Sequence, residues 1–195
     1  MANELMTGYQ RLAGVRLNMV VDESLRFTGS DHSSRSITNP TDKALLIHLR
    51  SISDLVITDA ATAFAESYKQ SKLVPIDVWS ESANFRGLDA IVQDATKKPM
   101  TFSRIGNPAE ALGERSAGGA AILLETGPTL TRKIAELDLI DEVCLTVSNV
   151  HNLAAANRVC HEFVQLMNLG NFIVSHLVES QGSTYIRLNR PNGVA

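Results

Sequence analysis

The chain has 195 residues, of which 44% are hydrophobic and 20% are charged. This length suits one domain with a substantial core, and the net charge of −3 argues against a basic surface for nucleic acid. No apolar run approaches the roughly 20 residues of a membrane span, and the first residues show no leader pattern. We therefore expect a cytoplasmic protein of one domain, without membrane or nucleic-acid partners.

The first half of the chain alternates strand-like runs with helical patterns. Residues 15–21 are β-branched and apolar, which predicts a strand. Asn39-Pro40 predicts a helix start, because Asn caps free N–H groups and Pro needs no partner at the first helical position. Strands are predicted at 55–58 and 76–79, with a helix over 60–69 between them.

The second half continues the same alternation. A weak strand at 99–104 precedes a second cap-plus-proline signal at Asn107-Pro108. Two further strands are predicted at 120–125 and 142–148. A helix with apolar residues at Leu130, Ile134 and Leu137 follows the first of them, and a helix with an apolar stripe from Leu153 to Met167 follows the second. The chain closes with predicted strands at 171–179 and 184–190, joined by a hairpin signal at 180–183.

Strand–helix alternation predicts an α/β fold, because right-handed crossovers through helices pair strands in parallel. The closing hairpin adds antiparallel strands. The sheet is therefore predicted to be mixed and mostly parallel, within three layers.

Several segments resemble a known family. The best match is 123–130 (LLETGPTL), followed by 139–148, and 15–20 (VRLNMV), 37–42 (ITNPTD) and 49–58 also match. Together they resemble the pyrimidine reductase family, which includes the reductase domain of the bifunctional riboflavin-biosynthesis deaminase/reductase. The resemblance spans most of residues 14–190 and implies a dihydrofolate-reductase-like fold with eight strands, so that residues 1–13 form an N-terminal extension of a single domain 1–195.

The resemblance also implies an activity. Relatives transfer a hydride from NADPH to a ribosylamino-pyrimidine phosphate, without a metal or a covalent nucleophile, so no individual catalytic residue is assigned. Relatives often pair through their C-terminal region, which implies a homodimer.

One predicted cofactor contact is the turn after the strand at 120–125. The family typically has two glycines here, whereas this chain has Glu125, Thr126, Gly127, Pro128 and Thr129. Backbone N–H groups at such a helix start can hold a phosphate, and a glycine lets a ligand approach closely. The alternative is a plain turn between a strand and a helix.

The second predicted cofactor contact is the turn after the strand at 55–58. Relatives usually read GAGT there, whereas this chain has Asp59-Ala60-Ala61-Thr62, preceded by Thr58. The resemblance assigns Thr58, Asp59 and Thr62 to the cofactor, but Asp59 would place a carboxylate where a diphosphate approaches, and like charges repel. The favoured alternative is that Thr58 or Asp59 simply caps a helix.

The end of the strand at 76–79 bears on cofactor choice. Relatives place hydroxyl and basic residues there against the 2′-phosphate of NADPH, so Ser80 is assigned to the cofactor. Glu81 reverses the usual charge and suits a free ribose hydroxyl. The cofactor is therefore NADPH or NADH, unless Glu81 is only an exposed loop residue.

Substrate contacts are expected in the segment after the first strand. The family has an S-x-D-G motif where this chain has Asp22-Glu23-Ser24-Leu25, so Asp22 and Ser24 are the candidates. The following loop offers Ser34 and Arg35, which suit a phosphate. The alternative for this loop is a solvated turn.

The remaining polar residues suggest no other chemistry. The histidines and cysteines show no metal-ligand spacing, so no metal is expected. Cys144 and Cys160 are expected to be small buried residues.

Two hypotheses remain. The first is a pyridine-nucleotide-dependent reductase acting on a small phosphorylated pyrimidine. The second is a non-catalytic relative that keeps the fold and the dimer, has lost the cofactor site, and binds another small molecule or a protein. The second is motivated by departures that cluster at Asp59, Glu81 and Ser24, all in one expected cleft.

Overall fold

The computed structural model describes residues 2–150 and 152–191; the expected domain also contains residues 1, 151 and 192–195, which lie outside this part. The described chain alternates strands, α-helices (α) and short 3₁₀ helices (η). In order, these elements are α1 (Ala2–Thr7), β1 (Gly14–Asp22), η1 (Ser34–Ser36), α2 (Pro40–Ser51), β2 (Leu55–Asp59), α3 (Ala60–Ala65), β3 (Ile76–Ser80), η2 (Leu88–Ala90), β4 (Met100–Arg104), α4 (Pro108–Ser116), β5 (Ala121–Leu124), α5 (Pro128–Ala135), β6 (Glu142–Ser148), α6 (Leu153–Leu166), β7 (Ile173–Ser180) and β8 (Ser183–Asn189).

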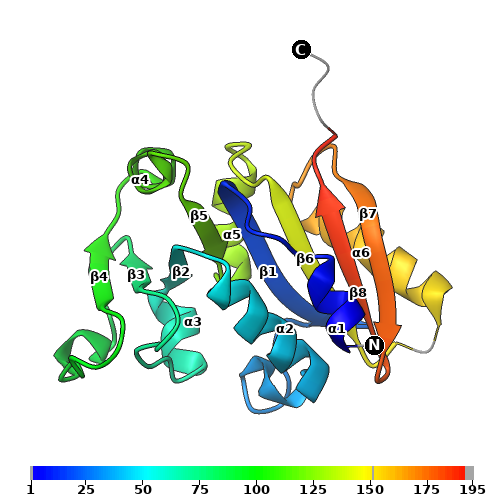
Figure 1. Cartoon of the computed structure of the whole chain (residues 1–195), viewed down its shortest axis with the longest axis horizontal. Coiled ribbons are helices and arrows are strands. Elements are labelled where there is room, and N and C mark those ends of the chain that lie inside the picture. The colour runs from blue at the N-terminus through cyan, green and yellow to red at the C-terminus, as the bar shows by residue number, and fades with distance from the viewer. Residues whose placement is uncertain (1, 151, 192–195) are drawn as a thin grey trace.

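The strands form one mixed sheet. Its eight strands lie in the order β4-β3-β2-β5-β1-β6-β8-β7 (Figure 1). Strands β1 to β6 pair in parallel, whereas β8 runs antiparallel to β6 and β7 antiparallel to β8. The predicted α/β class and the mostly parallel, eight-stranded mixed sheet are confirmed. Parallel pairing also brings the carboxyl ends of β1, β2, β3 and β5 to one edge.

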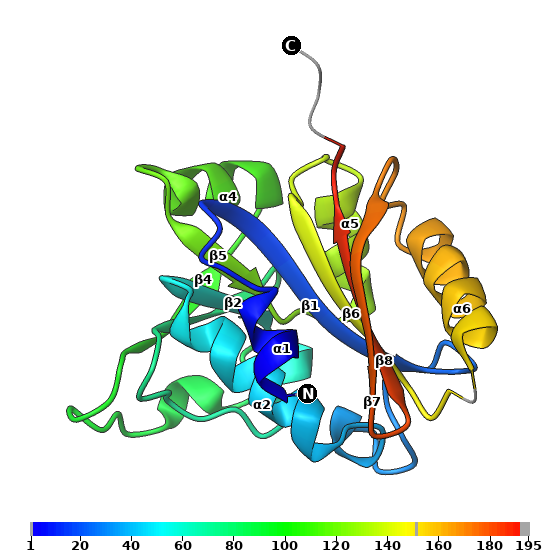
Figure 2. The ribbon, with the colours of Figure 1, turned by 45° about the vertical axis from the view of Figure 1, so that its right-hand side comes forward.

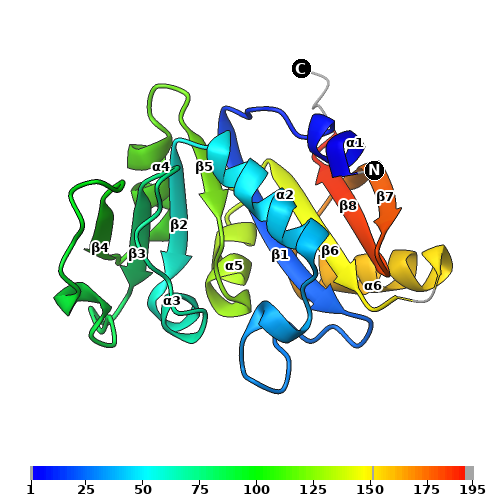
Figure 3. The same cartoon turned by 60° about the horizontal axis from the view of Figure 1, so that its bottom comes forward.

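Helices cover both faces of the sheet and make three layers (Figure 2 and Figure 3). On one face, α1, α2 and α3 bury apolar side chains against strand residues such as Val56 and Leu123. On the other face, α4, α5 and α6 pack against residues such as Leu17 and Leu145. Removing these side chains from water is the main force that holds the layers together.

Local signals place most helix and hairpin ends correctly. Asn39 caps α2 by accepting a hydrogen bond from the N–H of Asp42 at 3.0 Å, and Asn107 caps α4 by accepting one from Ala109 at 3.0 Å. The closing hairpin turns at Gln181 and Gly182, whose φ angles of 52° and 73° match the left-handed turn that strand twist favours.

Two predicted helical patterns end early. The helix expected over 60–69 stops at Ala65, because Ser67 takes a left-handed φ of 54° and turns the chain. Leu137 was expected on the apolar stripe of α5, but it follows the end of that helix and is 45% exposed.

The residues before β1 pack onto the sheet. Leu5 in α1 and Tyr9 just after it are buried, at 0% and 1% exposure. His48 of α2 forms a hydrogen bond with the carbonyl of Tyr9 at 3.0 Å. The expected N-terminal extension therefore contributes to the core.

Candidate functional site

A pocket of about 740 Å³ opens at the edge where β1, β2, β3 and β5 end. Residues of α2 and of the loop after β1 also line it. Pockets of this size commonly bind small molecules, and open α/β sheets bind ligands outside the carboxyl ends of their strands. This pocket is the candidate functional site.

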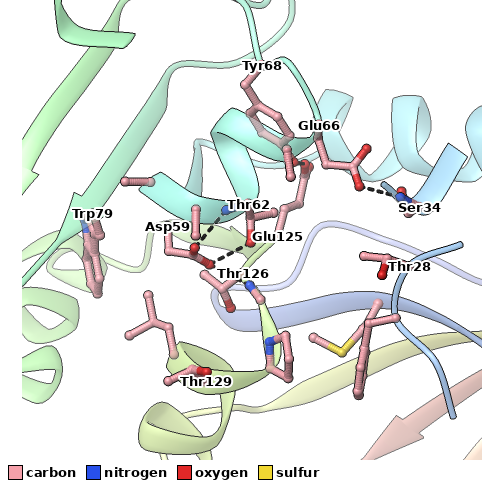
Figure 4. A pocket seen from close by; sticks show the side chains of 18 of the residues that line it. Thr28, Ser34, Asp59, Thr62, Glu66, Tyr68, Trp79, Glu125, Thr126 and Thr129 are labelled. Atoms are coloured by element: carbon pink, nitrogen blue, oxygen red, sulfur yellow. Dashed lines mark hydrogen bonds between the residues drawn. The ribbon is translucent and has the colours of Figure 1, made fainter. Parts of the chain in front are cut away.

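Most of the predicted contact residues line this one pocket. They come from both turns, the end of β3 and the loop after β1, and are Ser34, Asp59, Thr62, Ser80, Glu125, Thr126, Gly127, Pro128 and Thr129. Figure 4 shows several of them pointing toward one another. The predicted residues outside the lining are Asp22, Ser24, Arg35 and Thr58.

Glu125, which directly follows β5, is held by two partners. Arg50 of α2 donates from Nε at 2.8 Å and from Nη2 at 2.5 Å to the two carboxylate oxygens, and the Tyr68 hydroxyl donates to one of them. Burial alone would lower the pKa of Arg50, but the hydrogen bonds to Glu125 and its negative charge raise the pKa of Arg50 overall. The carboxylate of Glu125 is therefore fixed and charge-balanced at the wall of the pocket.

Asp59 connects the turn after β2 with the turn after β5. Its carboxylate accepts hydrogen bonds from the backbone and hydroxyl of Thr62 at 2.9 and 2.8 Å, so it caps α3 as the favoured alternative predicted. It also accepts one from the N–H of Gly127 at 2.6 Å, across to the other turn (Figure 4). The sequence did not reveal this second contact, which joins residues 68 positions apart.

The space beside Gly127 is filled by this chain. A Cβ atom added at Gly127 would lie 2.9 Å from Thr62 Oγ1 and 3.3 Å from Asp59 Oδ2. Thr126 turns inward instead, where its hydroxyl and that of Thr131 lie 2.8 Å apart. Thr58 is buried too, and its hydroxyl donates to the carbonyl of Glu125 at 2.7 Å, which ties β2 to the turn.

Trp79, at the end of β3, lines the pocket, and a hydrogen bond to Asp77 holds its side chain in place. Its indole N–H donates to Asp77 at 2.8 Å, and Asp77 also accepts from Thr101, Ser103 and Arg115 at 3.0, 2.7 and 2.7 Å. Burial alone would raise the pKa of Asp77, but these hydrogen bonds and Arg115 lower it overall. A stable carboxylate therefore orients the indole.

The predicted substrate residues are placed unequally. Asp22 is buried and holds its own loop, accepting from the N–H groups of Ser24 and Arg26 at 2.9 and 3.0 Å and from the Arg26 guanidinium at 2.7 Å. Ser24 is exposed, and Arg35 turns its guanidinium to the carbonyl of Glu66 at 2.7 Å. Ser34 alone of the four lines the pocket.

Sequence reasoning missed several lining residues, notably Asp42, Glu66, Tyr68 and Trp79. Asp42 lies in the first turn of α2, where an acidic residue is common because its charge suits the helix dipole. Its presence there therefore does not indicate a pocket. Trp79 ends the strand expected at 76–79, where only the following Ser80 and Glu81 were considered for the cofactor. Glu66 and Tyr68 lie where a longer helix was expected.

Elsewhere in the described residues, no group of three His, Cys, Asp or Glu side chains is arranged to hold a metal ion. Cys144 and Cys160 are buried and free, and burial raises the pKa of both thiols, that of Cys160 to about 11. No helix in this part of the chain is long and apolar enough to cross a bilayer.

Comparisons with known proteins give structural neighbours only. No family model matches the chain, and no curated protein matches it by sequence. Among solved structures, a pyrimidine reductase-like protein from Corynebacterium diphtheriae superposes with a TM-score of 0.69 at 16% identity, over 97% of this chain and 98% of that one.

Two further neighbours widen the comparison. The diaminohydroxyphosphoribosylaminopyrimidine deaminase/5-amino-6-(5-phosphoribosylamino)uracil reductase of Thermotoga maritima has a TM-score of 0.61 at 11% identity, covering 95% of this chain and 58% of its own. Dihydrofolate reductase from Enterococcus faecalis has a TM-score of 0.57 at 8% identity, over 94% and 99%. This chain therefore has the dihydrofolate-reductase-like fold of the pyrimidine reductases, the family that its sequence resembles.

Proposed function

We propose that this chain is a pyrimidine reductase relative that binds a small organic molecule in the pocket but no longer uses a pyridine dinucleotide. The observation that carries the proposal is the hydrogen bond from the Gly127 N–H to Asp59 at 2.6 Å. The pocket is kept, but the backbone group that would hold a phosphate already has a partner from this chain.

The residues present do not fit the diphosphate of NADPH or NADH. The side of Gly127 that faces β2 is filled by Thr62 and Asp59, and neither supplies a positive charge. Lys133, the nearest cation on α5 in the lining, forms an ion pair with Glu81 at the end of β3. In the two turns, the N–H groups of Thr62 and Gly127 therefore already donate to a carboxylate of this chain.

A second candidate is hydride transfer from NADPH or NADH to a ribosylamino-pyrimidine, the uracil reductase activity for which the Thermotoga maritima neighbour is named. One observation favours it: the predicted contact positions of both turns except Thr58, together with Ser80 and Ser34, line the same pocket. In this case the Asp59 side chain must move when the cofactor binds.

A titration separates the two candidates. Trp79 is the single tryptophan of the chain and lines the pocket, so its fluorescence reports occupancy. We expect NADPH and NADH to change neither the fluorescence nor the heat signal at millimolar concentration. We expect at least one phosphate-free nucleoside or pyrimidine to quench Trp79 and raise the melting temperature.

A genetic assay gives an independent answer. We expect the chain not to rescue growth of a riboflavin auxotroph that lacks the reductase. Rescue, or consumption of NADPH by the purified protein with the ribosylamino-pyrimidine phosphate, would establish the reductase and refute the first candidate.

We also propose that two copies associate through β7. This strand is the edge of the sheet and pairs only with β8 in the described chain. Ile173 and Val174 on it are 55% and 50% exposed. Unpaired edge strands with exposed apolar side chains favour pairing with another chain.

A further inference from the structure

Asp59 holds three donors with one carboxylate. Because β2 and β5 are neighbouring parallel strands, the turns that follow them lie side by side, and Asp59 at the end of β2 reaches Gly127 after β5. The N–H and hydroxyl of Thr62 supply the other two hydrogen bonds. This is the coordination that a bound phosphate oxygen receives from backbone and hydroxyl donors at a helix start.

The rest of the pocket adds to the negative charge. The acidic side chains in its lining are Asp42, Asp59, Glu66, Glu81 and Glu125. The basic ones among the described lining residues are Arg86 and Lys133, and Lys133 is paired with Glu81. The guanidinium of Arg86 stacks 5.5 Å from the ring centre of Phe64. Glu125 is paired with Arg50, so the carboxyl groups of Asp42, Asp59 and Glu66 remain against one basic side chain of the lining, Arg86. An anionic ligand therefore meets more negative than positive charge.

We propose that Asp59 determines the ligand class of this pocket by standing in for a phosphate. Ligands that would place a phosphate against Gly127 are rejected, and ligands with an uncharged or cationic group there are accepted. The inference rests on the proposed function and names the chemistry of its ligand: a phosphate-free small molecule.

The physical basis is direct. A ligand phosphate that reached the Gly127 N–H would have to displace the Asp59 carboxylate or lie about 4 Å from it, where two like charges in a partly buried site weaken binding by more than about tenfold. Removing the charge at residue 59 should therefore restore affinity for a dinucleotide and leave affinity for a phosphate-free ligand nearly unchanged.

The experiment compares Asp59→Asn and Asp59→Gly with the wild-type chain. The first variant removes the charge and keeps a good helix cap, and the second also opens the space, at a small cost in capping. NADH is the diphosphate probe, and adenosine and the uncharged dihydronicotinamide riboside are its phosphate-free parts. Trp79 fluorescence and calorimetry report binding, and circular dichroism confirms folding.

Glu66→Gln is the matched control. Glu66 lines the same pocket and accepts a hydrogen bond from the N–H of Ser34 at 2.6 Å, which a glutamine oxygen can keep. The control removes one negative charge without touching Gly127. We expect both Asp59 variants to bind NADH at least about tenfold more tightly than wild type, and the control to show a much smaller gain.

Three outcomes would overturn the assignment of Asp59. These are equal NADH affinity in wild type and Asp59→Gly, an equal gain in Glu66→Gln, and no NADH binding by any folded variant while phosphate-free ligands bind. In the last case the proposed function stands and only the role of Asp59 fails. Oxidation of NADH by the wild-type chain with a pyrimidine substrate would instead refute the proposed function.

Discussion

Asp42 is a partly buried carboxyl in the first turn of α2, at the wall of the pocket. The hydroxyl of Thr146 donates a hydrogen bond to it at 2.7 Å. Burial raises the pKa of Asp42, and this hydrogen bond offsets only part of the effect. The folded chain thus holds this proton more tightly than the unfolded chain does, so stability falls as pH rises from the unfolded pKa of about 3.9 through the higher folded value.

We predict that Asp42→Asn removes this pH dependence. Asparagine keeps an oxygen for the Thr146 hydroxyl but carries no charge. The unfolding free energy of the variant minus that of the wild type should therefore increase as pH rises from about 4 to about 7. Urea unfolding at several pH values measures the difference.

Asp31→Asn is the control with the opposite sign. Hydrogen bonds from Ser33 lower the pKa of this exposed carboxyl, so its contribution to stability is present above the unfolded pKa and is lost as pH falls. Asp31→Asn should therefore lose stability relative to wild type as pH rises. Parallel curves for wild type and Asp42→Asn would show that Asp42 does not titrate as described.

At the scale of elements, asparagine caps start three of the described helices. Asn39, Asn107 and Asn152 accept hydrogen bonds from the N–H groups of Asp42, Ala109 and Ala155 at 3.0, 3.0 and 2.9 Å. The Asn39 cap of α2 also connects to the sheet. Its oxygen accepts from the Tyr185 hydroxyl at 3.0 Å and its amide donates to Ser183 at 2.9 Å, both in β8.

We predict unequal costs for two identical substitutions. Asn107→Ala removes only a cap and should lower the unfolding free energy by about 1 kcal/mol. Asn39→Ala also removes the hydrogen bonds to Tyr185 and Ser183 of β8, so it should cost about 2 kcal/mol or more. Equal losses in urea unfolding would mean that the bonds from Asn39 to β8 contribute nothing.

At the scale of the whole molecule, the sheet has two different edges. β4 ends one side and β7 ends the other, and α6 covers one face near β7 (Figure 2). A twofold axis beside β7 would pair this strand with its own copy and cover Ile173 and Val174. The same geometry would leave the pocket, which lies at the ends of β2, β3 and β5, open.

We predict that Val174→Lys weakens the proposed dimer by at least about tenfold, because an ammonium group would be buried at the new interface. Val92→Lys is the control, since Val92 is 92% exposed in the loop before β4, at the other edge. Analytical ultracentrifugation measures both. A wild-type chain that sediments as a monomer at all concentrations would refute the dimer.

The sequence alone predicted what short-range forces control. Helix starts at Asn39 and Asn107 depend on atoms within three residues, and the hairpin at Gln181-Gly182 depends on two φ angles. Strand positions followed from apolar runs, and the resemblance supplied the fold. Most of the site residues that the resemblance indicated line the pocket, because turns after parallel strands meet at one edge.

Only the tertiary structure decided which polar groups satisfy one another. Asp59 reaches Gly127, Arg50 reaches Glu125, and Thr146 reaches Asp42, across 68, 75 and 104 residues. Such contacts depend on strand order and on the packing of the layers, which no local pattern encodes. The sequence therefore determined the elements of this fold and several residues of its pocket, and the packing of distant segments decided that the Asp59 carboxylate accepts a hydrogen bond from the Gly127 N–H.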